Sequence, residues 1–318
     1  MHKFYPLSKL IYPLFLNDAE TTGEQCNRAD KRSTIFGSPR LARAALAEEI
    51  STLKKLGLSS FLIYVLCNKD QSASETDQLA KILDPHYFLY DALSTLTAAH
   101  PESFFVVDLC TCHFLSSGQC GTTKGTEIDN LSTLIFFKTM GPLLAASGIQ
   151  AICLSSMMDG AVTTVRTALD KAGYHNTLII SQSAKIHSGF YGPFQSLSGG
   201  LSSVDVKKSY QLNPSNGKEM LRELELDSLE GADMVVLKPV SESLDLMVKV
   251  AHRFSTPILG YTTGGEYLML NESLPKEPRA RLDALNQYFT DLADTGMTAM
   301  ISYFAQEYAQ LRSQFAIK

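Results

Sequence analysis

The sequence predicts an α/β protein, a (β/α)8 TIM barrel in which strands and helices alternate along 318 residues. Two patterns predict it: eight short β-rich runs, and glycines that recur between a helical segment and the next run. The runs are nearly continuous in apolar residues, which is typical of parallel strands buried on both faces. They cover residues 10–16, 61–66, 104–109, 151–155, 177–181, 234–239, 257–261 and 299–304.

The segments between these runs have the pattern of amphipathic helices. One face of the segment 41–57 carries four apolar side chains, those of Leu46, Ile50, Leu53 and Leu56. Ser38 and Pro39 are predicted to be the N-cap and first residue of this helix. Five glycines are predicted left-handed helix ends: Gly57, Gly148, Gly173, Gly231 and Gly296. Eight such units favour a closed barrel, with an open doubly wound sheet as the alternative.

Composition narrows the functional classes. A hydrophobic content of 45% and a charged content of 19% predict a folded protein with a large core, expected to be one barrel domain over residues 1–318. The net charge of -5 offers no basic footprint for nucleic acid, so a small molecule is the expected partner. Because no apolar run is long enough to span a bilayer and six cysteines are too few for a disulfide scaffold, we expect a cytoplasmic protein without a membrane partner.

In a barrel of this type, chemistry lies at the carboxyl ends of the strands. Seven residues with reactive or hydrogen-bonding side chains follow or end the predicted strands: Asp108, Cys110, Ser155, Lys185, Lys238, Tyr261 and Tyr303. Burial disfavours a charged lysine and lowers its pKa, so that the neutral amine can attack a carbonyl. Lys185 and Lys238 are therefore candidate Schiff-base residues, with pairing to an acid or a phosphate as the alternative.

Three cysteines follow the third predicted strand. Cys110, Cys112 and Cys120 have spacing that can hold a tetrahedral thiophilic ion such as Zn²⁺, and three ligands leave a fourth position for water or substrate. The alternative is a set of buried, inert thiols. His113 is expected to lie in an extended segment and to point away from its neighbours.

Seven motifs, in order along the chain, resemble those of the porphobilinogen synthase family, also called 5-aminolevulinate dehydratase. They are DLCTCHFLSSGQCG, SSMMDG, SAKIHSGFYGPF, SYQLNP, EGADMVVLKP, GYTTGGEYLML and ISYFA. The resemblance covers roughly residues 10 to 312. It implies a TIM-barrel lyase that joins two molecules of 5-aminolevulinate into the pyrrole porphobilinogen with loss of two waters.

The resemblance also implies roles for individual residues. Lys185 and Lys238 match the two Schiff-base lysines, and Asp108 matches an acid that meets the amine of the substrate on Lys185. Cys110, Cys112 and Cys120 match zinc ligands. It also implies substrate-binding residues: Ser155 beside Asp108, Tyr191 and Phe194 as walls of the pocket for the substrate on Lys238, and Gln211 and Tyr303 as contacts to substrate carboxylates. Tyr261, at a strand end, is a further candidate.

Departures from the family pattern concentrate on the groups that hold substrate carboxylates. Gln195 and Lys207 stand where the family has arginines, and Gly264 stands where it has a serine. An amide or a point charge does not replace the bidentate fork of an arginine. Ser156 and Ala161 replace an acid and an arginine within SSMMDGAV. Gln195, Lys207 and Gly264 predict weaker binding of the substrate carboxylates. Two interpretations stay open for Ser156 and Ala161: a deleted ion pair without effect, or a changed floor of the pocket for the substrate on Lys185.

Three functions remain open on the sequence. The first is porphobilinogen synthesis itself. The second is a related zinc-assisted condensation of a different amino ketone, and the third is a non-catalytic zinc-binding or ligand-binding paralogue. The first strand begins about ten residues into the sequence, so residues 1–9 are predicted to be the remnant of the longer arm that joins subunits in this family. A homodimer or other small homo-oligomer is expected for this reason.

Overall fold

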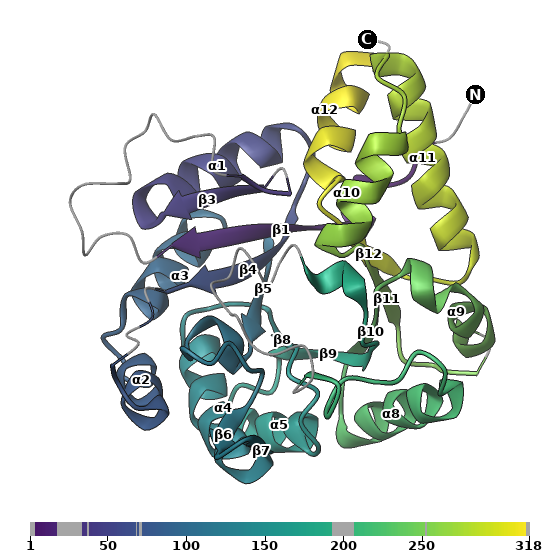
Figure 1. Ribbon diagram of the computed structural model, residues 1–318. Coiled ribbons are helices and arrows are strands. Elements are labelled where there is room, and N and C mark those ends of the chain that lie inside the picture. Colours follow the sequence, from purple (N-terminus) through teal and green to yellow (C-terminus); the bar gives the residue numbers. More distant parts are fainter. Residues whose placement is uncertain are drawn as a thin grey trace.

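The structure is a computed structural model that describes residues 4–17, 34–36, 38–67, 69, 72–192, 207–251 and 253–315. Eight parallel strands close into a barrel at its centre (Figure 1). The last strand returns to the first, with Leu10 opposite Met300. The barrel strands are β1 (Leu10–Asn17), β4 (Ser60–Leu66), β5 (Phe104–Leu109), β8 (Ala151–Leu154), β9 (Leu178–Lys185), β10 (Met234–Lys238), β11 (Ile258–Tyr261) and β12 (Ala299–Ile301). Each predicted run overlaps one of them, and the predicted fold class is confirmed.

Helices surround this barrel on the outside (Figure 1). They are α1 (Arg43–Lys55), α2 (Glu75–Ile82), α3 (Phe88–Ala99), α4 (Asn130–Ala146), α5 (Ala161–Lys171), α8 (Gly217–Glu230), α9 (Leu244–Ala251), α10 (Gly264–Ser273), α11 (Pro278–Asp294) and α12 (Ala305–Phe315). The five glycines predicted to end helices all have positive φ, between 80° and 104°. The prediction that these glycines end helices in a left-handed conformation is therefore confirmed.

Alternate residues of each strand build two core layers. Along β1, Tyr12 and Leu14 pack against the surrounding helices, whereas Ile11 and Phe15 fill the barrel interior. Because both faces of the sheet are buried, a strand needs apolar residues at consecutive positions and not at every second one. This is the physical origin of the continuous apolar runs in the sequence.

The predicted start of the first helix is wrong. Ser38–Ala42 forms strand β3, which pairs in parallel with the end of β1 and antiparallel with β2 (Thr34–Ile35). Since the backbone of residues 40–42 pairs with the sheet, the helix begins only at Arg43. A second short hairpin, β6 (Thr122–Lys124) with β7 (Glu127–Asp129), follows the cysteine loop.

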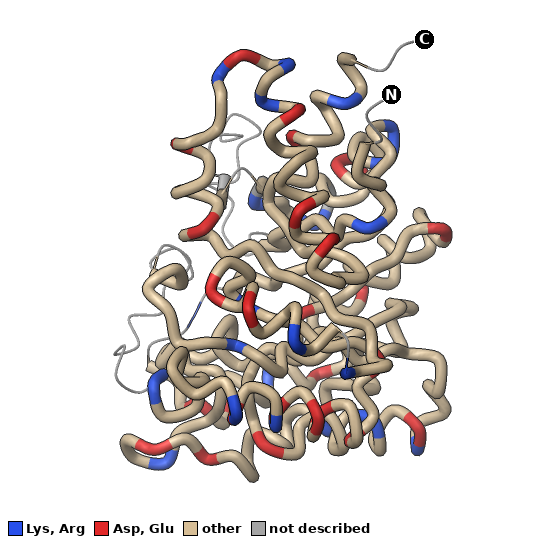
Figure 2. The backbone as a smooth tube through the Cα atoms, turned by 90° about the vertical axis from the view of Figure 1, so that its right-hand side faces the viewer, with Lys and Arg blue, Asp and Glu red and all other residues tan. Residues whose placement is uncertain are grey.

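Charged residues of both signs are interspersed over the outside of the molecule (Figure 2). Within the described residues, no helix combines the length and the apolar composition needed to cross a bilayer. This finding agrees with the short apolar runs noted in the sequence.

Replacing Gly296 by alanine is expected to lower the free energy of unfolding by about 3 kcal/mol, because its φ of 103° strains any side chain and a Cβ would overlap Ala251. Gly125→Ala is the matched control: φ is 67° there and nothing lies within 4 Å of the added methyl, so about 1 kcal/mol is expected. Urea denaturation measures both values, and equal losses would contradict the packing argument.

Candidate active site

Lys185 and Lys238 are the last residues of the adjacent strands β9 and β10. Their backbones are register partners, so both side chains rise from the carboxyl end of the barrel at the same level. β9 is longer than the sequence predicts and carries Lys185 within the strand, not after it. The structure thus brings the two candidate amines to one mouth.

The amine of Lys238 lies in an aromatic environment. Its Nζ is 3.8 Å from the ring centroid of Tyr261 and 5.6 Å from that of Tyr191. The Tyr191 hydroxyl donates a hydrogen bond of 3.0 Å to the Lys238 carbonyl and fixes the ring beside the strand end. Burial, together with the positive charge of Lys185, lowers the pKa of Lys238 from 10.5 to about 8. The neutral fraction of this amine near neutral pH is therefore much larger than that of an ordinary lysine.

Lys185 has a different environment, on the cysteine side of the mouth. Its Nζ donates to the Ser155 carbonyl at 2.5 Å and lies 3.6 Å from the Cys120 sulfur. Burial lowers the pKa of Lys185, but negative charge on Cys120 and Cys110 raises it by more, so the net direction is upward. The two lysines consequently have opposite shifts, and only Lys238 fits the expectation of a lowered pKa.

The sulfur atoms of Cys110, Cys112 and Cys120 all lie within 4.8 Å of one another. Burial raises the pKa of Cys110, whereas hydrogen bonds with Cys110 and Cys120 lower that of Cys112. Three cysteine sulfurs this close together form the donor set that a thiophilic cation prefers. The three residues can bind a metal ion.

His113 points into the site, contrary to the sequence prediction. Thr111–His113 forms a 3-10 turn (η3) and not an extended segment, so the ring turns back toward β5. Its Nε2 lies 3.1 Å from Oδ2 of Asp108, and its ring centroid is 5.4 Å from that of Tyr64. Burial lowers the pKa of His113, but Cys112 and Asp108 raise it by more, to about 10. Within the described part of the chain, Oδ1 of Asp108 has no hydrogen-bond partner, which leaves one carboxylate oxygen for a ligand.

The segment that carries Lys207 and Gln211 docks against the end of β9. The backbone N–H of Leu212 donates to the Lys185 carbonyl at 3.1 Å. The backbone N–H of Gln211 donates a hydrogen bond to the Lys207 carbonyl at 2.9 Å. Tyr210 connects this segment to the cysteine loop, because its hydroxyl donates to Gln119 at 2.9 Å and accepts from the Cys120 N–H at 3.4 Å. Lys207 and Gln211 are both buried.

Tyrosine hydroxyls line the other side of the mouth. Tyr64 and Tyr261 share a hydrogen bond of 2.8 Å, and the hydroxyls of Tyr261 and Tyr303 are 3.4 Å apart. Gly264 begins helix α10, whose N-terminus is closed by a capping box between Thr263 and Glu266. Tyr261 ends β11, Gly264 begins the helix that follows it, and Tyr303 follows β12. These three predicted residues therefore lie at or after the ends of the two strands that come next to the Lys238 strand around the barrel.

Two predicted substrate-binding residues, Phe194 and Gln195, lie outside the described residues. Three residues of the mouth were missed on the sequence: Phe36, Tyr64 and Tyr210. Tyr210 lies within the motif SYQLNP, which could have identified it. Tyr64 is one of several apolar or aromatic residues in its strand, and Phe36 belongs to no motif. The sequence therefore offers no reason to place either residue at the mouth.

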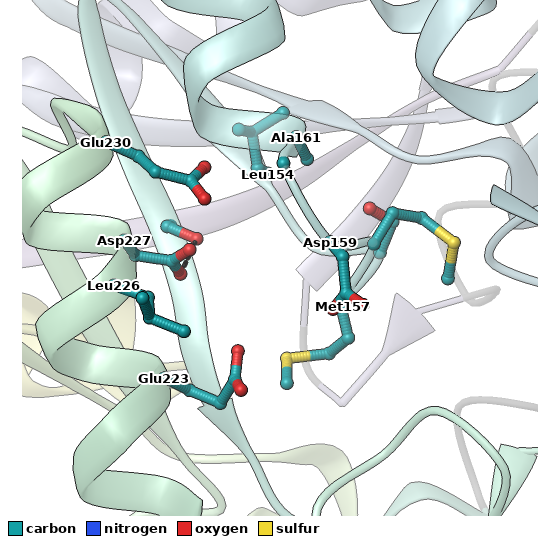
Figure 3. A pocket seen from close by; sticks show the side chains of 12 residues that line it. Leu154, Met157, Asp159, Ala161, Glu223, Leu226, Asp227 and Glu230 are labelled. Atoms are coloured by element: carbon teal, nitrogen blue, oxygen red, sulfur yellow. Dashed lines mark hydrogen bonds between the residues drawn. The ribbon is translucent and has the colours of Figure 1, made fainter. Parts of the chain in front are cut away.

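Ser156 and Ala161 line a small cavity between the loop after β8 and helix α8, and neither lysine is among its lining residues. Figure 3 shows Glu223, Asp227 and Glu230 of α8 facing this loop and its Asp159. The cavity has a volume of about 80 Å³. Burial and the negative charges of Asp227 and Asp159 raise the pKa of Glu223, and burial and the charges of Glu230 and Asp159 raise that of Asp227. The replacement of an arginine by Ala161 thus leaves an acidic cavity.

Comparisons with known proteins identify the family. The model of the delta-aminolevulinic acid dehydratase family matches residues 3–311. The chain belongs to the delta-aminolevulinic acid dehydratase family. Two curated members illustrate its distance from the rest of the family. It is 33% identical over 301 residues to the enzyme of Methanothermobacter thermautotrophicus, covering 94% of this chain and 89% of that one. It is 31% identical over 307 residues to that of Bacillus subtilis, covering 95% and 90%.

A solved structure of the family has the same fold. The delta-aminolevulinic acid dehydratase of Toxoplasma gondii, in complex with its reaction product porphobilinogen, superposes with a TM-score of 0.84 at 28% identity. The match covers 100% of this chain and 90% of that chain. The family resemblance noted in the sequence motifs is therefore confirmed.

Proposed function

We propose that this protein is a hydro-lyase of the 5-aminolevulinate dehydratase type. It would join two amino ketones, 5-aminolevulinate or an analogue, into a pyrrole with loss of two waters. The observation that carries the proposal is the placement of Lys185 and Lys238 on adjacent strand ends, with different surroundings for the two amines. Two distinct carbonyl-capturing lysines at one mouth suit a reaction that must hold two similar substrates in different orientations.

The two lysines would divide the work. The Lys238 amine, with its lowered pKa, forms an imine with one ketone, and the former carbonyl carbon of that ketone becomes more electrophilic. Lys185 holds the second ketone beside Asp108 and the cysteine loop. The free oxygen of Asp108 can accept a proton or a substrate ammonium group, because His113 occupies only its other oxygen. Closure of the ring then forms one carbon–carbon and one carbon–nitrogen bond.

The cofactor that suits the cysteine cluster is Zn²⁺. Cys110, Cys112 and Cys120 would hold it, and three sulfur ligands leave a position open for water or substrate. When bound, it supplies Lewis-acid activation of the carbonyl or amine that lies beside Lys185. Compensation of the thiolate charges would also remove the effect that raises the pKa of Lys185.

Trapping the imine with borohydride tests this function. The protein is incubated with 5-aminolevulinate or with another amino ketone at several pH values, adducts are mapped by mass spectrometry, and pyrrole formation is assayed in parallel. The rate of adduct formation at Lys238 is expected to rise with pH and to level off above about 8, because only the neutral amine attacks. An ordinary lysine, with a pKa near 10.5, keeps gaining reactivity beyond that pH. No adduct on either lysine with any amino ketone would contradict the proposal.

Two further expectations stay predictions. They are assembly into a homodimer or other small homo-oligomer and a cytoplasmic location. Single-domain organisation of residues 1–318 is likewise kept as a proposal, consistent with the one barrel that the described residues build.

A further inference from the structure

The ring of Phe36 occupies the far end of the Lys238 side of the mouth. Phe36 lies between β2 and β3 with a φ of 52°, a left-handed conformation that is unusual for an aromatic residue. Its side chain is only 6% exposed and belongs to the cluster that fills the barrel interior. It meets the Tyr303 ring edge-on at 5.0 Å and lies 6.3 Å from the Tyr267 ring. Packing against these rings holds the strained residue in place.

Phe36 occupies the space that a side chain at position 264 would need. A Cβ built on Gly264 would overlap the Cζ and Cε2 atoms of the Phe36 ring. The two features are therefore complementary: the glycine makes room for the ring, and the ring fills the room. A hydroxyl or other polar group at position 264 is excluded as long as Phe36 stays where it is.

A line of aromatic rings leads from the Lys238 amine to Phe36. The amine lies 3.8 Å from the Tyr261 ring, which is 6.3 Å from the Tyr303 ring, which in turn contacts Phe36. The hydroxyls of Tyr261 and Tyr303 lie within reach of each other. The Phe36 ring carries no hydrogen-bond donor, so a carboxylate that reached it would lose its hydrogen bonds to water without replacement there, whereas an alkyl group can pack against the ring.

The arginine that shares a cavity with Tyr303 and Tyr267 is already paired. Arg281 lines this cavity of about 400 Å³, and its Nε and Nη2 donate to the two carboxylate oxygens of Glu307 at 2.5 and 3.0 Å. Its Nη2 also donates to Asn271 at 2.5 Å. A carboxylate that entered from the barrel side would therefore compete with Glu307 for this cation.

From these contacts we infer that Phe36 and Gly264 close the Lys238 subsite to a carboxylate, so that Lys238 takes an α-amino ketone with a short alkyl chain. The inference rests on the proposed function and specifies the substrate class of one of its two subsites. Burial of an unpaired carboxylate against apolar rings is costly, whereas burial of a methyl group is favourable. The bonds formed and the waters lost are the same as in the condensation of two 5-aminolevulinate molecules. One carbon–carbon and one carbon–nitrogen bond form, two waters leave, both lysines are released, and the pyrrole carries an alkyl group in place of one acid side chain.

A competition between two probes tests the inference. They are 5-aminolevulinate and 1-aminopentan-2-one, which has a methyl group in place of the carboxylate and is otherwise the same length. We expect borohydride to trap the alkyl ketone at Lys238 at least about tenfold more efficiently than 5-aminolevulinate, a ratio within reach of one unfavourable contact in a closed pocket. An equal or reversed preference at Lys238 would overturn the inference. A lack of any adduct at either lysine would instead overturn the proposed function and this inference with it.

Variants separate the role of the ring from a general effect on folding. Phe36→Ala opens the subsite and is expected to shift the Lys238 preference toward 5-aminolevulinate by about tenfold or more. Gly264→Ser alone is expected to lower the melting temperature, because its side chain displaces the ring, and adding Phe36→Ala should restore it. Phe88→Ala, on helix α3 outside the barrel, is the control that should leave the preference unchanged. An unchanged preference in Phe36→Ala, with the protein folded, would overturn the inference.

Discussion

Lys238→Met is expected to abolish pyrrole formation and to leave the barrel folded. The variant removes the amine that lies over the Tyr261 ring but keeps a flexible apolar side chain of similar length. Without this nucleophile the rate should fall by roughly 10⁴-fold, on the scale of the losses seen when a nucleophile of a covalent mechanism is removed. Steady-state pyrrole formation from the preferred pair of amino ketones measures the effect.

The stability of the same variant should not fall. The lowered pKa of Lys238 means that the folded protein disfavours the charged amine, so its removal relieves a cost instead of breaking a favourable pair. Thermal unfolding should therefore give an unchanged or higher melting temperature at neutral pH. In the variant, borohydride adducts should map to Lys185 alone. Lys249→Met, an exposed position on α9, is the control for the loss of a lysine. Retention of more than about a tenth of the activity in Lys238→Met would exclude a covalent role, since such a loss is far below the scale for a nucleophile.

Cys120→Ser is expected to remove bound zinc and most of the activity. A serine hydroxyl is a harder and weaker ligand for a thiophilic ion than a thiolate, so the three-sulfur cluster would lose its affinity. Lewis-acid activation contributes several kcal/mol, so the rate of pyrrole formation should fall by roughly 10³-fold. Zinc content by atomic emission and turnover with and without added zinc measure the two effects.

Cys67→Ser is the matched control for this prediction. The sulfur of Cys67 lies 3.0 Å from the Tyr87 hydroxyl, and Cys67 does not belong to the three-sulfur cluster. Zinc content and activity should both stay at the level of the unmodified protein. Full activity of Cys120→Ser without detectable zinc would show that the cysteines serve another purpose.

Much of the barrel could be predicted from the sequence, because burial on both faces of the sheet leaves a pattern that local sequence displays. Consecutive apolar positions predicted strands such as β1 and β4. Glycines predicted helix ends, such as the one at Gly296, because the positive φ there disfavours other residues. The start of the first helix could not be predicted. Ser38 and Pro39 have the local pattern of a helix start, but pairing with β1, a partner distant in sequence, overrides it.

The lysines and cysteines of the site were likewise visible in the sequence. They follow or end barrel strands, and because all strands of the barrel are parallel, their carboxyl ends lie together at one mouth. The orientation of His113 was not visible, because it depends on a single 3-10 turn in the loop. The opposite pKa shifts of Lys185 and Lys238 also depend on which charges lie beside each amine in space.

The sequence by itself determined the fold class, the strand ends and the residues able to do chemistry, because those follow from periodicity, glycine and residue type. It also marked Gly264 as a departure from the family pattern. Only the tertiary structure decided what that departure means. The ring that occupies the space beside Gly264 belongs to Phe36, a residue more than two hundred positions away, and no local pattern encodes contacts across such a distance.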